Sequence, residues 1–387
     1  MPIRNRFSEM LPELSAFRRD LHAHPELGFD CFRTASRVAQ ALREMGCDQV
    51  VEGIAKSGVV GVIKGRQAAS GKVVGLRADM DALPIHEATG LPHASTIPGK
   101  MHACGHDGHT TMLLGAARYL AETRNFDGTV VLIFQPAEEG GGGAKVMCDE
   151  GLMERFGIHE VYGMHNRPGH DFGEFVIRSG PFYASADEFE VSIEGRGGHA
   201  AKPHDCIDPT VAAAQVVLAL QTVVSRNTDP VAQVVVSVCT FRTESEAFNV
   251  IPQRVLLKGT VRTLTPETRD MAQARITDIL THTAAAHGAR AEVNYMRGYP
   301  VMVNHAAETE VAMKIGRGVT GRCIEGPYNM GGEDFAYMLE ERPGAYIVLG
   351  AGPGAKLHHP EYDFNDEIIP IGASWFVGMV EERMPAP

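Results

Sequence analysis

The stretch of this chain that is richest in potential chemistry is residues 101–109, which read Met-His-Ala-Cys-Gly-His-Asp-Gly-His. A thiolate and neutral imidazoles are ligands that suit zinc and its neighbours, whereas carboxylates and water suit harder ions such as manganese. Cys104 and His106 lie two positions apart and can reach one ion or two adjacent ions. A lone histidine-rich turn more often caps a helix, and a helical pattern does begin near Asp107. The metal-site interpretation is favoured because further ligand candidates recur downstream.

A second chemical signal is the pair Glu138-Glu139, which follows an apolar run and Pro136. Adjacent carboxylates that leave an extended segment point in different directions, so one can bind a metal ion while the other stays free. A free carboxylate beside a metal-bound water is a natural general base, which takes a proton as the water attacks a carbonyl and later donates it to the leaving amine. By itself such a pair is more often a solvated turn, but its place at a strand end favours chemistry.

Two more histidines occupy comparable positions, since His165 follows Gly-Met and His358 lies in Leu-His-His-Pro. Individually each could be a surface or hydrogen-bonded histidine. Taken with Cys104, His106 and one glutamate they make five ligands, more than one tetrahedral zinc needs. Two metal ions that share a bridging ligand are the simpler explanation.

The elements that must position these residues are short apolar runs rich in β-branched residues. The runs cover residues 73–78, 129–134, 161–164 and 346–349, and each is followed by a polar loop that carries candidate residues. Open α/β sheets place their sites beyond the carboxyl ends of the strands, and continuous apolar runs fit strands buried on both faces. Amphipathic patterns over residues 7–24 and 110–121 predict covering helices. The fold class is therefore predicted to be α/β.

From about residue 185 the pattern changes. Strands are predicted at residues 189–193, 233–241, 255–261 and 291–295, and helices at residues 209–224 and 266–287. Their order is β-α-β-β-α-β, the ferredoxin-like α+β arrangement. A chain of 387 residues exceeds the size of a single hydrophobic core. We therefore expect a discontinuous catalytic domain, residues 1–184 and 297–387, and an inserted domain, residues 185–296.

Composition excludes several classes of protein. A net charge of -12 argues against a nucleic-acid partner, and no apolar run is long enough to predict a membrane span. The seven cysteines are odd in number and scattered, which predicts a reducing compartment and hence a cytoplasmic protein.

Motifs over nearly the whole chain resemble, in order, the M20D amidohydrolases, a metallopeptidase subfamily that includes hippurate hydrolases, N-acyl-amino-acid amidohydrolases and indole-3-acetyl-amino-acid hydrolases. Besides residues 101–109, the motifs are Arg-Ala-Asp-Met-Asp-Ala-Leu-Pro (77–84), Gln-Pro-Ala-Glu-Glu (135–139), Gly-Met-His (163–165), Gly-Gly-His-Ala-Ala-Lys-Pro-His (197–204), Asn-Val-Ile-Pro (249–252) and Gly-Glu-Asp-Phe (332–335).

The resemblance implies a zinc-peptidase-like catalytic domain with an inserted lid and dimerisation domain. The two metal ions, Zn²⁺ or Mn²⁺, would be bound by Cys104, His106, Glu139, His165 and His358, with Glu138 as general base. The thiolate favours zinc, yet the subfamily is often manganese-dependent. His199 would donate to the oxyanion, in its own subunit or in a partner's, although a local hydrogen bond in a lid loop would also explain it. A homodimer or higher homo-oligomer is expected.

Four further residues receive roles by the resemblance. Asn249 and Arg262 are candidates for substrate binding, because a guanidinium suits bidentate contact with an α-carboxylate, although Arg262 could equally be a surface strand residue. Asp79 and Asp81 stand where the broader superfamily has a His-x-Asp ligand, and they are expected to orient a ligand such as His106.

The predicted activity is hydrolysis of the amide bond of small N-acyl-amino acids, which releases a carboxylic acid and a free amino acid. A metallo-dipeptidase is the alternative within enzymes, because a dipeptide differs chiefly by a free amine. A non-catalytic metal-binding or interaction protein is the alternative of another class. Phe182, Tyr183 and Tyr328 would fit either an aromatic acyl pocket or simple core packing.

Overall fold

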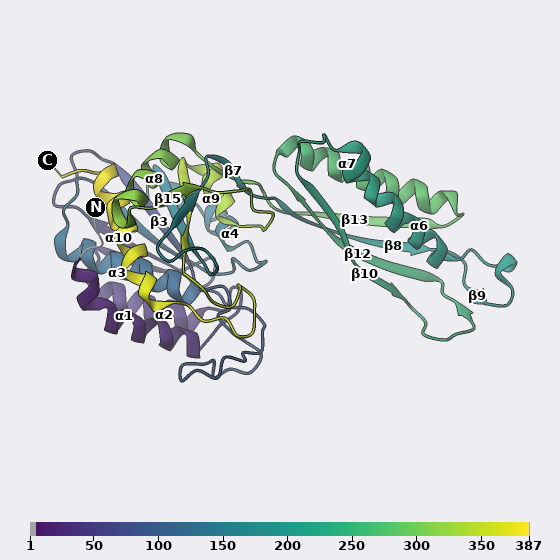
Figure 1. The fold of residues 1–387 in the computed structure, drawn as a ribbon, viewed down its shortest axis with the longest axis horizontal. Coiled ribbons are helices and arrows are strands. Elements are labelled where there is room, and N and C mark those ends of the chain that lie inside the picture. Colours follow the sequence, from purple (N-terminus) through teal and green to yellow (C-terminus); the bar gives the residue numbers. More distant parts are fainter. Residues whose placement is uncertain (1–4, 387) are drawn as a thin grey trace. The chain divides into compact units, whose positions relative to one another are not determined.

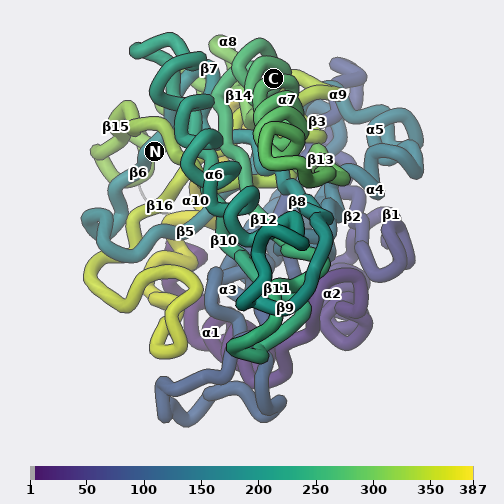
Figure 2. Tube along the Cα trace, turned by 90° about the vertical axis from the view of Figure 1, so that its right-hand side faces the viewer, coloured from purple at the N-terminus to yellow at the C-terminus, as the bar shows by residue number. Residues whose placement is uncertain are grey.

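The computed structural model describes residues 5–386 and divides the chain into two compact units. The first unit comprises Met1–Gly180, Val303–Pro327 and Asp334–Pro387, and the inserted unit comprises Pro181–Met302 and Tyr328–Glu333. The purple and yellow parts of the chain therefore belong to one unit and the teal part to the other (Figures 1 and 2). The sequence predicted boundaries between the units at residues 184/185 and 296/297, and these differ from the observed boundaries. It also placed residues 328–333 in the first unit. They group with the inserted unit because the Ala184 N–H donates to the Asn329 carbonyl at 2.9 Å.

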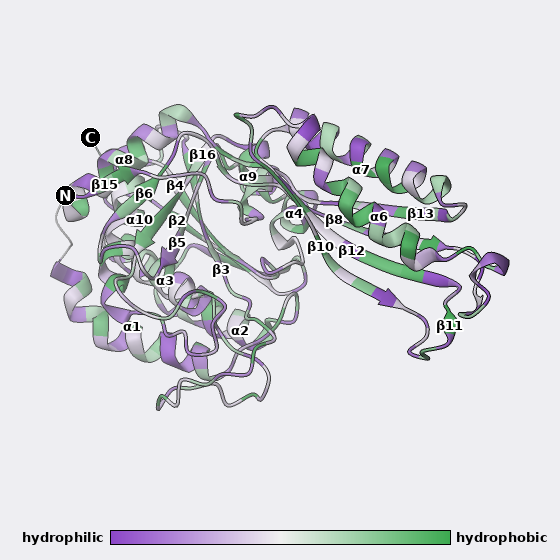
Figure 3. Ribbon diagram, turned by 45° about the vertical axis from the view of Figure 1, so that its right-hand side comes forward, coloured by the Kyte–Doolittle hydropathy of each residue, from purple (hydrophilic) through white to green (hydrophobic). Residues whose placement is uncertain are grey.

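The first unit is built on an eight-stranded sheet of order β1-β2-β4-β3-β5-β16-β6-β15. The strands are β1 (Gln49–Ile54), β2 (Gly58–Lys64), β3 (Val73–Asp79), β4 (Thr129–Gln135), β5 (Glu160–Arg167), β6 (Phe175–Ile177), β15 (Cys323–Glu325) and β16 (Gly344–Gly350). The central strands β4, β3, β5 and β16 are parallel to one another and almost wholly buried. Their hydrophobic character is visible in Figure 3. Parallel order at the centre brings the carboxyl ends of these strands to one edge of the sheet.

Helices cover both faces of this sheet. They are α1 (Asn5–Ala23), α2 (Phe32–Glu44), α3 (His106–Thr123), α4 (Gly143–Asp149), α5 (Leu152–Arg155), α8 (Ala306–Thr320), α9 (Phe335–Glu341) and α10 (Ile369–Arg383). Successive residues of β5 show the two faces, because Tyr162 packs edge-on against Trp375 of α10 while Gly163 lies against Phe335 of α9. The α/β class predicted from the sequence is confirmed.

The inserted unit has the predicted β-α-β-β-α-β order. Its elements are β8 (Ala186–Glu194), α6 (Pro209–Thr222), β10 (Val234–Thr243), β12 (Arg254–Thr263), α7 (Pro266–Ala286) and β13 (Arg290–Tyr299), and its antiparallel sheet has the order β10-β12-β8-β13. Both helices begin at a side-chain cap, since Asp208 accepts from the Thr210 N–H and Thr265 from the Thr268 N–H. A π-helical turn, Val223–Asn227, extends α6.

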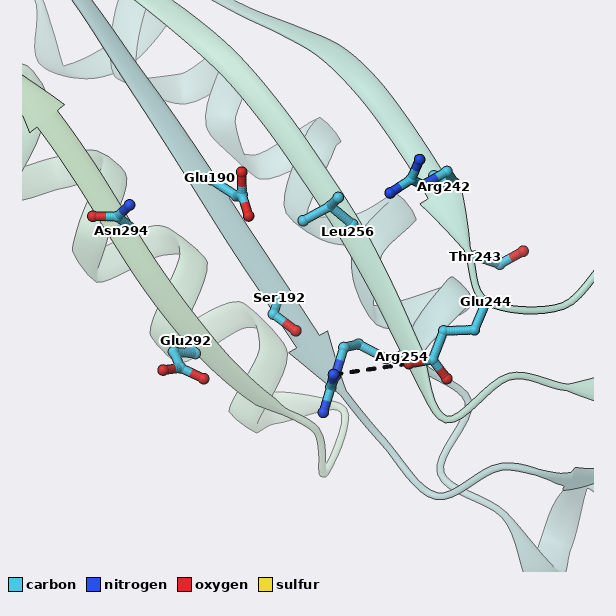
Figure 4. A pocket seen from close by; sticks show the side chains of 9 residues that line it. All are labelled: Glu190, Ser192, Arg242, Thr243, Glu244, Arg254, Leu256, Glu292 and Asn294. Carbon is cyan, nitrogen blue, oxygen red and sulfur yellow. Dashed lines mark ion pairs between the residues drawn. The ribbon is translucent and has the colours of Figure 1, made fainter.

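Helices α6 and α7 pack on one face of this sheet, where alternate side chains such as Phe189, Val191 and Ile193 are buried. The opposite face is polar and carries a shallow recess of about 780 Å³ (Figure 4). Glu190 and Lys258 pair across neighbouring strands on this face, with 2.6 Å between oxygen and nitrogen. The alternation of apolar and polar residues thus leaves one polar sheet face without a covering helix.

Two small strand pairs complete the fold. β7 (Gly180–Tyr183) pairs with β14 (Met302–Asn304), where the chain passes between the units, and β9 (Gly198–His199) pairs with β11 (Val250–Ile251). Short 3₁₀ turns lie at Pro203–Asp205 and Asp366–Ile368. Within the described part of the chain, no helix is long and apolar enough to cross a bilayer.

Candidate metal centre

The predicted ligands of the first unit converge at the carboxyl ends of its central strands. Asp79 and Gln135 are the last residues of β3 and β4 and stand opposite each other in the ladder. His165 is near the end of β5, opposite Val348 of β16. His106 is the first residue of α3. The four parallel strands and the start of one helix therefore hold the candidate site.

Cys104 belongs to two groups of potential ligands. Its sulfur lies within 4.8 Å of the ligand atoms of His106 and His165, and it forms a second such group with Glu139 and His358. Burial, and then the carboxylates of Glu139 and Glu138, raise the pKa of the Cys104 thiol. A thiolate therefore forms here only when cations lie beside it. Cys104 is therefore shared by two groups of residues, each of which could hold a metal ion.

The imidazole of His165 is held in the orientation that a ligand needs. Its Nδ1 is 2.6 Å from the Asn166 carbonyl oxygen, to which it donates, and its Nε2 faces the Cys104 sulfur at 3.3 Å. Burial, and then the neighbouring His109, lower the pKa of His165, so the ring is neutral. A hydrogen bond at one nitrogen leaves the lone pair of the other available for metal.

His106 is fully buried, and neither of its ring nitrogens has a hydrogen-bond partner. Its Nδ1 is 3.4 Å from an Asp81 oxygen, and its Nε2 is 3.7 Å from an Asp79 oxygen. Burial opposes a positive charge on the ring, but Asp79 and Asp81 outweigh it and raise the pKa of His106 to about 10. Buried nitrogens left bare among carboxylates mark a position where a cation would be stabilised.

Glu139 and His358 meet on the other side of Cys104. A Glu139 oxygen is 3.2 Å from His358 Nε2, and the His358 N–H donates to the Ala103 carbonyl at 2.7 Å. His358 has φ +65°, and Ala137, just before the glutamates, has φ +58°. Positive φ values are rare for residues other than glycine and gather at functional sites.

Asp81 holds the backbone of both glutamates. Its two oxygens accept the N–H groups of Glu138 at 2.9 Å and of Glu139 at 3.0 Å. The Glu138 carboxylate is 4.0 Å from His106 Nε2. Asp81 therefore fixes the backbone conformation in which the Glu139 side chain faces Cys104 and the Glu138 side chain faces His106.

Several residues that support the centre were not singled out from the sequence. His109 uses both ring nitrogens, one with Asp79 at 2.6 Å and the other at the Asn166 backbone N–H at 3.0 Å. Both ring nitrogens of His109 therefore have partners, and we interpret His109 as a support for Asp79. Arg77, Gln135 and Asp334 form a buried network beside Asp79. The signal was present, because all but Asn166 lie in the quoted motifs.

Two glycines allow the close packing of this region. A Cβ on Gly105, where φ is +97°, would lie 2.3 Å from Asn166 Oδ1, and a Cβ on Gly143 would lie 1.7 Å from the Pro136 carbonyl oxygen. Gly143 is therefore needed for tight packing against the loop that carries the glutamates.

The candidates of the inserted unit do not all lie together. His199 and Asn249 are neighbours, because β9 pairs with β11 and the Ala200 N–H donates to the Asn249 carbonyl at 3.0 Å. Strand β12 begins at Arg254, shortly after Asn249, and Arg262 lies near its other end. The eight residues from Arg254 to Arg262 correspond to roughly 26 Å of strand. Phe182 and Tyr183 are buried and Tyr328 is exposed.

Known proteins resemble this chain in sequence and in fold. The model of peptidase family M20/M25/M40 matches residues 75–382. The hippurate hydrolase of Campylobacter jejuni is 42% identical over 94% of both chains. The N-acetyl-L-cysteine deacetylase of Bacillus subtilis is 40% identical over 97% of this chain and 89% of its own.

The chain belongs to peptidase family M20. A dinuclear metal-binding M20 peptidase from Bacillus subtilis superimposes with a TM-score of 0.85 at 33% identity and covers 98% of this chain and 100% of its own. The predicted family and the predicted hydrolase class are confirmed.

Proposed function

We propose that this M20 protein hydrolyses the amide bond of N-acyl-amino acids and releases a carboxylic acid and a free amino acid. The observation that carries the proposal is the pair of ligand groups that share Cys104, with Glu138 beside them. Relatives named as a hippurate hydrolase and an N-acetylcysteine deacetylase support this substrate class.

The residues present fit two divalent metal ions, because His106 is bare at both nitrogens and Cys104 lies in both ligand groups. Cys104, His106, Glu139, His165 and His358 would hold the ions. Bound there, such ions would polarise the amide carbonyl and lower the pKa of a bound water. Zinc or manganese is the proposed occupant, since thiolate and imidazole favour zinc while the carboxylate also suits manganese.

Glu138 accepts the proton as water oxygen forms its bond to the amide carbon. It returns that proton to the amide nitrogen as the carbon–nitrogen bond breaks, so the amine leaves neutral. Asp81 holds Glu138 through the backbone, and His199 is the proposed donor to the developing oxyanion.

The test is amino-acid release from hippurate, N-acetylcysteine, an indole-3-acetyl-amino acid and simple dipeptides. The protein is assayed as purified, after chelation, and after addition of Zn²⁺ or Mn²⁺. We expect chelation to abolish cleavage of the N-acyl compounds and one of the metals to restore it. Cleavage of dipeptides alone would replace the proposal with a metallo-dipeptidase, and bound metal without any cleavage would oppose catalysis.

Two variants, Glu138→Gln and Glu139→Gln, distinguish the proposed general base from the proposed metal ligand. We expect Glu138→Gln to keep wild-type metal content and to lose about 10²- to 10⁴-fold in kcat, the usual share of a general base. Glu139→Gln should lose metal. Retained turnover in Glu138→Gln would remove the assignment of the base.

We also infer a homodimer in which the inserted unit contributes to the partner's site. Arg262 and Asn249 are too far apart to contact one small substrate within one inserted unit, so a site that uses both takes them from two subunits. Mixing Glu138→Gln with His199→Ala tests this. Activity regained by the mixture would place His199 in the partner's site, and two inactive variants that stay inactive when mixed would contradict it.

A reducing compartment, the cytoplasm, is the proposed location. All seven cysteines are free, and the sulfur of Cys104 has to stay reduced to serve as a metal ligand.

A further inference from the structure

A buried network next to the candidate metal centre joins residues from three of the quoted motifs. The proposed reaction gives no role to three of its members, Arg77, Gln135 and Asp334. Arg77 Nε donates to Gln135 Oε1 at 2.8 Å, Nη1 to Asp79 Oδ2 at 2.7 Å and Nη2 to Asp334 Oδ1 at 3.0 Å. The Gln135 amide donates to both Asp334 oxygens, at 2.9 and 2.8 Å. All four side chains are buried, with at most 1% of any residue exposed.

Asp334 forms hydrogen bonds with residues on both sides of the loop that carries the two glutamates. The glutamates lie in residues 136–142, the glutamate loop, which joins the last residue of β4, Gln135, to α4, whose second residue is Ala144. The Gln135 side chain bonds to Asp334, and the Ala144 N–H donates to Asp334 Oδ2 at 2.9 Å. One carboxylate therefore holds both ends of the segment that presents Glu138 and Glu139.

The same network reaches the histidines through Asp79. One Asp79 oxygen accepts from Arg77, while the other is 2.6 Å from His109 Nδ1. Ions buried in this way are weak evidence for stability, because desolvation offsets most of their attraction. A cluster that links two parts of a site is better explained by the geometry that it imposes.

We propose that Asp334 is a positioning residue that clamps the glutamate loop and, through Arg77, orients Asp79 beside His106 and His109. The Gly-Glu-Asp-Phe motif at residues 332–335 thereby acquires a role. This inference rests on the proposed function for its effect on turnover, but its effect on metal binding does not depend on the substrate.

The geometry requires two acceptor oxygens at this position. Asp334 receives donors from Arg77, Gln135 and Ala144 on two oxygens. Asparagine would turn an amide N–H₂ toward one of those donors and leave a buried donor unpaired. Asp334→Asn should therefore loosen the loop while it changes almost no volume.

The experiment measures three properties of Asp334→Asn. They are affinity for Co²⁺, followed by the absorption of the cobalt–thiolate bond, kcat and KM on the best substrate of the panel, and the thermal midpoint. We expect Co²⁺ affinity and kcat each to fall by about 10- to 100-fold, the usual effect of losing a group that orients ligands. KM should change much less, because the proposed role of Asp334 is to hold the glutamate loop and not to bind substrate.

Glu160→Gln is the matched control. Glu160 is buried in the same unit and pairs with Arg383 at 2.8 and 3.0 Å. It is the first residue of β5, whereas His165 lies near the last residue of that strand, so Glu160 is far from the candidate metal centre. It should lower the thermal midpoint and leave Co²⁺ affinity and kcat unchanged. An Asp334→Asn variant that behaves like this control would overturn the proposal.

A double variant, Asp334→Asn with Gln135→Glu, tests the hydrogen-bond pattern. It moves the carboxylate across one hydrogen bond and keeps the charge beside Arg77, so we expect it to regain part of the lost Co²⁺ affinity. A folded double variant with no recovery would contradict the clamp. If Asp334→Asn fails to fold, Gln135→Met removes one arm of the clamp and should still weaken Co²⁺ binding. If no substrate is cleaved, the Co²⁺ results still decide this inference independently of the proposed function.

Discussion

Single residues of this centre do more than one task, and Asp81 is the clearest case. It accepts the backbone N–H groups of both glutamates and lies 3.4 Å from His106. The sequence identified the ligand candidates, because residue type and spacing carry that information. It could not identify His109 as a support for Asp79, because only the folded chain shows that both of its nitrogens are occupied.

Asp81→Asn should lower both metal affinity and kcat by about 10- to 100-fold. The amide N–H₂ would meet the N–H of Glu138 or Glu139, and the loop would shift. Asp30→Asn is the control, because the Asp30 side chain forms an exposed ion pair with Lys56. Metal titration and steady-state kinetics check this, and equal behaviour of the two variants would contradict it.

His22 carries a pH-dependent part of the stability of the first unit. It lies between two carboxylates, with Nδ1 2.8 Å from Asp107 and Nε2 3.4 Å from Glu87. Arg18 also contacts Asp107 at 3.4 Å. Burial opposes protonation, but the bonds to Asp107 and Glu87 raise the pKa of His22 to about 9.

A folded-state pKa above the ordinary value of 6.5 stabilises the folded protein below pH 6.5, and this stabilisation is lost as the pH rises toward 9. The contribution is on the order of 3 kcal/mol. His22→Gln should therefore have a lower urea midpoint than wild type at pH 6, and the gap should close near pH 9. Trp375, the single tryptophan, is buried in α10 and reports unfolding of this unit. The rings of His93 and His102 also face His22, so their variants must show a smaller change for the assignment to hold.

At the scale of elements, the central strands were predictable and the short ones were not. β3, β4, β5 and β16 carry continuous apolar runs and appear within a few residues of the predicted limits. β9 and β11 have two residues each and no pattern of their own, because only their mutual pairing defines them. Helix α3 begins at His106, within one residue of the start expected near Asp107, and its first turn is buried in the site.

That first turn depends on Gly105, and Gly90 provides a matched comparison. Both have positive φ, but a Cβ on Gly90 would meet nothing within 4 Å, whereas one on Gly105 would lie 2.6 Å from the Tyr362 hydroxyl. Each alanine variant should lose about 1 to 2 kcal/mol of stability from backbone strain. Only Gly105→Ala should also weaken metal binding, because it displaces Cys104 and His106. Metal affinities and urea midpoints distinguish the two effects, and unchanged metal affinity in Gly105→Ala would refute this.

At the scale of the whole molecule, the inserted unit offers an apolar surface for the proposed dimer. Val211 and Leu218 lie one heptad apart on α6 and are 50% and 64% exposed, and β10 is an edge strand of the four-stranded sheet. Exposed apolar side chains beside an unpaired strand edge are typical of a self-association surface.

Leu218→Glu should therefore shift the protein toward a monomer in light scattering. Met296→Glu on β13, the opposite edge strand, adds the same charge at a residue that is 40% exposed and should leave the mass unchanged. A wild-type monomer would contradict the dimer, and a dimer that survives Leu218→Glu would contradict the assignment of this surface as its interface.

The place of β16 between β5 and β6 constrains how the protein is made. Strands β5 and β6 are separated in the sheet by residues 344–350, which leave the ribosome long after both. The inserted unit is complete by residue 333, so it can fold while the first unit still lacks a central strand. His358 follows later still. A nascent chain therefore cannot bring all five proposed ligands together until residue 358 has been synthesised.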